Sequence, residues 1–189
     1  MGRISILILL FFSSLSSCRN YYINEKGGYR PKRPKFEFAK LPYQLKEQDL
    51  IDTASVYVSE GTVFYGEEAR KIISYFIFFS NGRCYEGRNE IEKPELTLTT
   101  LNNFNKYGSI GYFKLNQNKI EIELYTVTLG GARGNVGYYT KNYGYIKNDS
   151  IYFFINPKLD IKDLPIPNDQ NCVIYIRQKM AGLTGTPDW

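Results

Sequence analysis

The sequence predicts a mostly β domain, an antiparallel up-and-down barrel of about seven or eight strands with one short helix. From about residue 50, short runs rich in Tyr, Phe, Ile and Val alternate with Gly, Asn and Asp, which is typical of antiparallel strands. Short turns separate most of the runs, so neighbouring runs are expected to pair as hairpins. Closing the sheet would leave no exposed edge. A β-sandwich is the alternative fold.

The first strands of this region surround a hairpin turn. Ser55–Val58 is predicted to be a strand and Glu67–Lys71 a turn. Ile72–Phe79 is apolar on both faces, which predicts a strand that is covered on both sides. The segment Ser80–Arg83 contains Asn-Gly, the strongest short hairpin signal, so a return strand is expected from Cys84.

The one predicted helix is Thr97–Lys106, because three apolar residues recur at helical spacing and would share a face: Leu98, Leu101 and Phe104. Later in the chain, a hairpin is expected from Tyr139–Lys147 and Ser150–Ile155, which are joined by Asn-Asp. Val173–Gln178 is predicted to be the last strand.

The central hairpin, Gly111–Leu115 with Lys119–Thr126, has the clearest alternation in the chain. Because successive side chains of a strand point to opposite faces, one set is expected to point inward and the other to face water. The inward set is Ile120, Ile122 and Leu124, and the outward set is Lys119, Glu121 and Glu123.

The N-terminus has the parts of an export signal. Arg3 precedes the apolar run Ile4–Phe12, and small residues lead to Cys18. The apolar run is much shorter than the roughly 20 residues that a membrane-spanning helix needs. Residues 1–17 are therefore expected to be a signal peptide.

The residues Leu15-Ser16-Ser17-Cys18 resemble the lipobox of bacterial lipoproteins. The resemblance implies that the Cys18 thiol carries a diacylglycerol, and that the chain is anchored by acyl chains to a bacterial envelope membrane. Arg19 follows Cys18 where an Asp would favour retention, which by the sorting pattern of such lipoproteins implies the outer membrane. The alternative is an ordinary cleaved signal with Cys18 present by chance.

Basic charge is concentrated in residues 19–35, which hold six Lys and Arg residues against Glu25 alone. With Gly27, Gly28, Pro31 and Pro34, this composition predicts that residues 18–40 form a flexible basic tether between the anchor and the domain. A basic segment could also bind nucleic acid, but a tether at an exported membrane surface rarely meets any. Residues 41–180 are expected to form the barrel, and 181–189 a loose tail.

The order of the predicted strands is similar to that of small lipocalin-like bacterial lipoproteins. The residues that carry this resemblance are Tyr75–Arg83, Gly111–Glu123 and the Tyr-rich hairpin after them. The resemblance implies a barrel fold. One expected function is a binding module whose interior, lined by Phe, Tyr and Ile, holds a small apolar ligand. The alternative is an envelope scaffold, or a protein-interaction module, with a filled core and with a contact surface such as the 129–143 loop.

The sequence has few of the residue types that form catalytic or metal sites. The chain has no histidine, which excludes nucleophiles paired with histidine, and it has no cysteine pair at metal-ligand spacing. No cofactor, metal or enzymatic activity is expected. Glu121 and Glu123 share a strand face at a spacing near that of glycosidase carboxylates, but solvated surface residues are the simpler interpretation. Glu86 and Glu92 form no better set.

Two further features have alternative interpretations. Cys84 and Cys172 either form a disulfide, which export permits, or remain as buried free thiols. The Gly-rich stretch Gly130–Gly137 lacks the Gly-Lys-Ser/Thr end of a phosphate-binding loop, so a hairpin loop is expected there.

Overall fold

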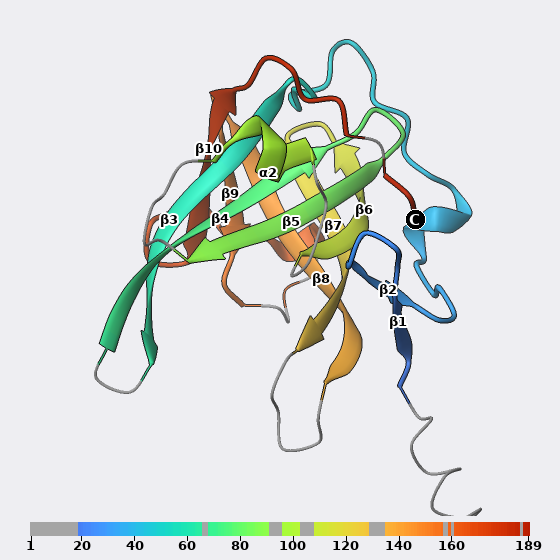
Figure 1. The fold of residues 1–189 in the computed structure, drawn as a ribbon. Helices are drawn as coiled ribbons and strands as arrows, with labels where there is room; N and C mark the ends of the chain where they lie inside the picture. Colours follow the sequence, from blue (N-terminus) through green and yellow to red (C-terminus); the bar gives the residue numbers. More distant parts are fainter. Residues whose placement is uncertain are drawn as a thin grey trace, which may run out of the picture.

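The computed structural model describes residues 19–65, 68–90, 96–102, 108–128, 135–156, 159, 161–185 and 187–189. Its main feature is a closed barrel of eight antiparallel strands (Figure 1). The barrel strands are β3 Ser55–Tyr65, β4 Glu68–Phe78, β5 Arg83–Glu90, β6 Ser109–Asn116, β7 Lys119–Thr128, β8 Val136–Lys147, β9 Ser150–Phe154 and β10 Cys172–Lys179.

Each strand pairs with the next one in the chain, and β10 closes the barrel against β3. The predicted up-and-down barrel is therefore confirmed, and the sandwich is not formed. A separate two-stranded sheet consists of β1 Tyr21–Ile23 and β2 Tyr29–Pro31. Short helices complete the fold: η2 Phe38–Lys40, α2 Leu98–Asn102 and η3 Ile161–Asp163.

The turn predicted at Glu67–Lys71 is wrong, because β4 begins at Glu68 and pairs with β3 from Tyr65↔Glu68 to Val56↔Ile77. The polar side chains there misled the prediction, since Glu68, Ala69, Arg70 and Lys71 are exposed within the strand. The described part of the predicted helix is α2, and residues 103–106 of the prediction lie outside the described residues.

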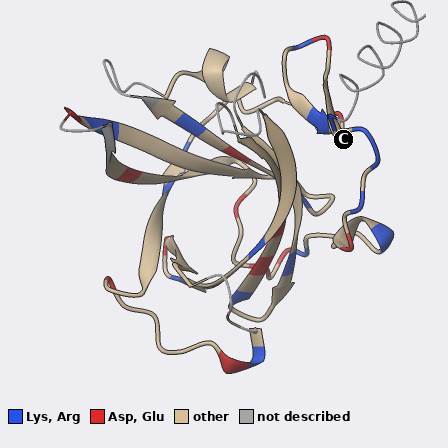
Figure 2. Cartoon of the chain, turned by 90° about the horizontal axis from the view of Figure 1, so that it is seen from below, with Lys and Arg blue, Asp and Glu red and all other residues tan. Residues whose placement is uncertain are grey.

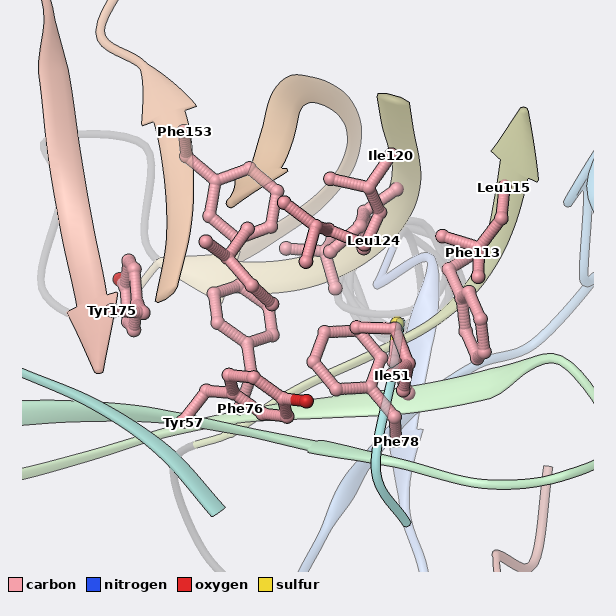
Figure 3. Packing of buried hydrophobic residues seen from close by; sticks show 14 residues of the cluster. Ile51, Tyr57, Phe76, Phe78, Phe113, Leu115, Ile120, Leu124, Phe153 and Tyr175 are labelled. Carbon is pink, nitrogen blue, oxygen red and sulfur yellow. The ribbon is translucent and has the colours of Figure 1, made fainter. Parts of the chain in front are cut away.

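Half of the barrel interior is filled by apolar side chains (Figure 3). They alternate along the strands with residues that point outward, as the pleat requires. Aromatic rings pack edge to face in this half, with Phe78 5.4 Å from Tyr57 and 5.1 Å from Phe113 between ring centroids. The inward positions predicted for β7 are confirmed, since Ile120, Ile122 and Leu124 all lie in this cluster.

The filled half lies at the end of the barrel where tight turns join β4 to β5, β6 to β7 and β8 to β9. Gly82, Gln117 and Asn148 adopt positive φ angles of 78°, 57° and 54° in these turns. Ile51 and Tyr43, from the segment that precedes β3, pack against the same cluster. This end is called the closed end below. The opposite end, which carries the long connections from β5 to β6 and from β9 to β10, is called the open end.

Residues 19–40 are called the strap, because they pack along the outer face of the barrel. Tyr21, Phe36 and Phe38 are buried in an outer cluster with Tyr112 of β6. Phe36 contacts the rings of Tyr112 and Tyr139, each at 5.1 Å. The prediction of a flexible tether is wrong here: the sequence is basic and rich in Gly and Pro, but its aromatic residues have an apolar wall to cover.

The C-terminal residues are not a loose tail. Trp189 donates a hydrogen bond from Nε1 to the carbonyl oxygen of Gly111 at 3.2 Å. Asn102 of α2 donates to the carbonyl oxygen of Gly182 and accepts from the amide of Thr184. The tail and α2 together cover the outer face next to the strap.

Strap and tail are joined by a buried ion pair. Only 4% of the Arg30 side chain is exposed, and its Nη2 lies 2.6 Å from Asp188 Oδ1. Its Nε donates to the same oxygen at 2.9 Å. The guanidinium also lies 5.2 Å from the ring of Trp189, a cation–π contact. The two ends of the described chain therefore stabilise each other.

Three outward tyrosines of the barrel lie over glycines of adjacent strands. A Cβ atom built on Gly87 would lie 2.2 Å from Cζ of Tyr75, and one on Gly137 would lie 1.9 Å from Oη of Tyr125. Tyr85 lies over Gly108 in the same way. The glycines let the rings lie flat on the sheet, where the strap and the tail cover them.

We expect Gly87→Ala to destabilise the protein by about 1–3 kcal/mol, because the new methyl group must displace the buried ring of Tyr75. Gly61→Ala is the matched control, since its nearest neighbour would be a side-chain atom of Ile72 at 3.7 Å. Urea unfolding measures both. Equal losses in the two variants would show that the ring contact is not the cause.

Candidate ligand site in the barrel

A row of polar side chains crosses the inner wall of the barrel towards its open end. Glu86 and Arg88 of β5 alternate with Cys84, which belongs to the inner cluster, so both side chains face inward. Arg88 Nη2 lies 3.6 Å from Glu86 Oε1. Glu86 is paired across strands with Ser109, whose hydroxyl lies 2.7 Å from that of Thr126 on β7. The row therefore spans three adjacent strands.

Tyr175 of β10 lies at the same level of the barrel, with β3 between its strand and β4. It hydrogen-bonds to Ser74 of β4, which is the cross-strand partner of Arg88. Burial raises the pKa of the Tyr175 phenol, the negative charge of Glu86 raises it further, and the positive charge of Arg88 lowers it. Groups from β4, β5 and β10 thus converge at one level of the barrel.

An aromatic floor separates this level from the filled half. The Phe76 ring lies 5.1 Å from Phe153 and 5.0 Å from Tyr175, and the latter two rings are 5.7 Å apart. The three residues come from β4, β9 and β10 and meet at the middle of the barrel (Figure 3). An apolar surface therefore lies beneath the charged and hydroxyl groups.

Solvent reaches the inner wall above the floor. The Arg88 side chain is 64% exposed although it faces inward. Val173, two residues before Tyr175 on the same face of β10, is 40% exposed. In contrast, Phe78 and Phe113 in the filled half are fully buried. At this level Arg88 and Val173 are accessible, whereas Ser74, Ser109 and Tyr175 are buried.

The pKa of the Glu86 carboxyl reflects its position between the apolar half of the interior and the polar level. Only 13% of its side chain is exposed, and burial raises the pKa of its carboxyl. Arg88 and the hydroxyl of Ser109 oppose that rise by stabilising the carboxylate. Burial and Arg88 therefore act in opposite directions on the charge of the Glu86 carboxyl.

The structure does not bring together the cysteines considered in the sequence. Cys84 and Cys172 are both buried and free, so the possible disulfide is absent. Cys84 faces the interior, whereas Cys172 is adjacent to the inward Val173 and faces the other side of the wall. Burial raises the pKa of both thiols, which keeps them protonated and unreactive.

The predicted pair of outward carboxylates is also not a site. Glu123 is only 3% exposed, because the strap covers it. Its two oxygens accept hydrogen bonds from the amides of Glu37 at 2.9 Å and Phe38 at 3.0 Å. Its expected exposure to water is therefore wrong, and its role is to hold the strap.

Other candidates from the sequence lie outside the described residues: the lipidation site Cys18, Glu92 and residues 130–134 of the Gly-rich stretch. Sequence reasoning considered Glu86 but missed its pairing with Arg88 inside the barrel. The available signal was the alternation Cys84, Glu86, Arg88, which places two charges on the face of an apolar residue.

The described residues contain no group of three His, Cys, Asp or Glu side chains that could hold a metal ion. Among the same residues, no helix has the length and hydropathy to cross a membrane. Comparison with protein-family models, with curated proteins and with solved structures found no match to this chain.

Replacing Glu123 with Gln should loosen the strap. The side-chain NH2 group of Gln would face one of the two backbone N–H groups, so two donors would meet and one would lack an acceptor. An unsatisfied buried donor costs about 1–3 kcal/mol. We expect faster hydrogen exchange at the amides of Glu37 and Phe38. Glu60→Gln, on the exposed outer face of β3, should leave both amides unchanged. Unchanged exchange in Glu123→Gln would contradict the role given to this carboxylate.

The raised pKa of Glu86 predicts a pH dependence of stability. A carboxyl whose pKa is higher in the folded protein contributes most below the ordinary value of 4.5 and loses that contribution as the pH rises through the raised pKa. The stability of Glu86→Gln relative to the unmodified protein should therefore increase with pH across that interval. Urea unfolding at a series of pH values measures it, and a constant difference would refute the assignment.

Proposed function

We propose that this chain is a bacterial lipoprotein of the outer membrane, anchored through Cys18, whose barrel binds a small amphipathic molecule at its open end. The observation that supports binding is the convergence of Glu86, Arg88 and Tyr175 above an aromatic floor, at a level that solvent reaches. The anchor is inferred from the lipobox-like residues Leu15–Cys18.

The chemistry of the site favours a ligand with an apolar body and an acidic head. The apolar body would lie beside Val173, which is 40% exposed, above the buried rings of Phe76 and Phe153. The head would meet Arg88, whose guanidinium suits a carboxylate or phosphate. A purely apolar ligand, the expectation from the sequence, would leave the exposed Arg88 with only its 3.6 Å contact to Glu86 and is the weaker candidate.

A second function, an envelope scaffold with a filled core, is supported by the packing of the closed half. Side chains of this chain occupy its interior, where Phe78 and Ile122 are fully buried. Val56 is fully buried on the outer side of the wall. A scaffold needs no access to the interior, so binding of a probe above the floor separates the two functions.

The anionic fluorophore 1-anilinonaphthalene-8-sulfonate has the proposed ligand chemistry and can serve as the probe. We expect Arg88→Gln to weaken its binding about tenfold or more, because a hydrogen bond to a charged group contributes about 1.5–3 kcal/mol. Val173→Trp should block binding by filling the accessible level. Fluorescence titration of the natively folded protein measures both.

Arg83→Gln is the matched control, since Arg83 lies on the same strand but on its outward face. It should bind the probe as the unmodified protein does. Equal affinities for Arg88→Gln and Arg83→Gln, or no binding by the unmodified protein, would overturn the ligand site and favour the scaffold.

A further inference from the structure

A second cavity lies outside the barrel, between the strap and the wall formed by β7 and β8. Its volume is about 590 Å³. Strap residues form one side, and two tyrosines of the barrel form the other. The lining residues are Arg19, Asn20, Pro31, Lys32, Arg33, Lys35, Tyr125 and Tyr139.

The charge of this cavity is entirely positive among its described lining residues. Four of them are Lys or Arg, and none is acidic. None of the four takes part in an ion pair with another described residue. Figure 2 shows basic residues along the strap, to one side of the barrel. The cavity therefore holds concentrated positive charge that the described part of the protein does not neutralise.

The barrel side of the cavity is held rigidly. Tyr125 and Tyr139 contact each other with ring centroids 5.0 Å apart. The amide of Lys35 donates to the Tyr139 hydroxyl at 2.9 Å. The side chain of Asn20 donates to the carbonyl oxygen of Gly137 at 2.5 Å and accepts from its amide at 3.1 Å. These hydrogen bonds tie the strap to the wall at Asn20 and at the Lys35 amide, on either side of Lys32 and Arg33 in the sequence.

We propose that this cavity binds the phosphate of an anionic phospholipid headgroup from the membrane that anchors the chain. The proposal rests on the proposed function, because Arg19 of the lining follows the anchoring Cys18 directly and adjacent Cα atoms are only about 3.8 Å apart. Acyl chains on Cys18 would bring the cavity to the headgroup layer. There, lysine and arginine side chains pair with phosphate, and each contributes about tenfold or less to affinity.

The geometry favours a lipid over a polymeric anion. The cavity is bounded by the strap on one side and the tyrosines on the other, and its volume of about 590 Å³ suits one headgroup. A nucleic acid or an acidic protein would need a longer basic track, whereas these cations are confined to residues 19–35.

The test uses the full chain in a neutral detergent and a short-chain lipid, dihexanoylphosphatidylglycerol, below its micellar concentration. Calorimetric titration should show binding of this lipid and none of its zwitterionic phosphatidylcholine counterpart. The double variant Lys32→Gln with Arg33→Gln should bind about tenfold to thirtyfold more weakly. The matched control, Lys46→Gln with Lys147→Gln, removes two exposed charges outside the cavity and should bind normally.

Three results would overturn the proposal: equal binding of both lipids, equal weakening in the two double variants, or binding of glycerol phosphate as tight as that of the lipid, which would make free phosphate the ligand. The mass of the same purified chain shows separately whether Cys18 carries acyl chains. Headgroup binding without acylation would refute the anchor alone, and acylation without headgroup binding would refute the cavity alone.

Discussion

β4 is apolar on both faces from Tyr75 to Phe78, and this constraint determines how the rest of the chain is arranged. Phe76 and Phe78 of β4 point into the barrel, while Tyr75 and Ile77 point out of it, and all four are buried. A closed barrel can bury only the inner set. The outer set needs a second layer, and the strap, α2 and the tail supply it. The ion pair of Arg30 with Asp188 joins two parts of that layer.

The interior divides into two levels because the strands change character along their length. Near the tight turns, inward positions carry Phe, Ile and Leu, and their side chains fill the space. Towards the open end the same faces carry Ser74, Glu86, Arg88 and Ser109, and of these four only Arg88 is largely exposed to solvent. A buried carboxyl with a raised pKa beside an accessible arginine is typical of sites that bind or transfer charge.

Alternation and turn chemistry were enough to predict the barrel and most of its strands, as the inward residues of β7 and the Asn81-Gly82 turn demonstrate. The strap could not be predicted in this way, because its composition is that of a linker and its order comes from contacts with residues about a hundred positions away. Glu123 illustrates the limit: its position on the outward face was predicted, but its burial depends on a segment that no local pattern links to it. Glu86 and Arg88 differ, because their alternation with Cys84 is a local signal, but the strands that face them are known only once the barrel has closed.

The contacts of the strap limit the order in which parts of the chain can fold. Its partners are Gly137 and Tyr139 on β8, Glu123 on β7 and Asp188 in the tail. These residues are synthesised long after the strap, and contacts between such distant positions form slowly because a long loop must close first. The strap therefore docks only after β7 and β8 have paired. Until then the aromatic residues of the strap, and the outer wall that they later cover, lack their native contacts.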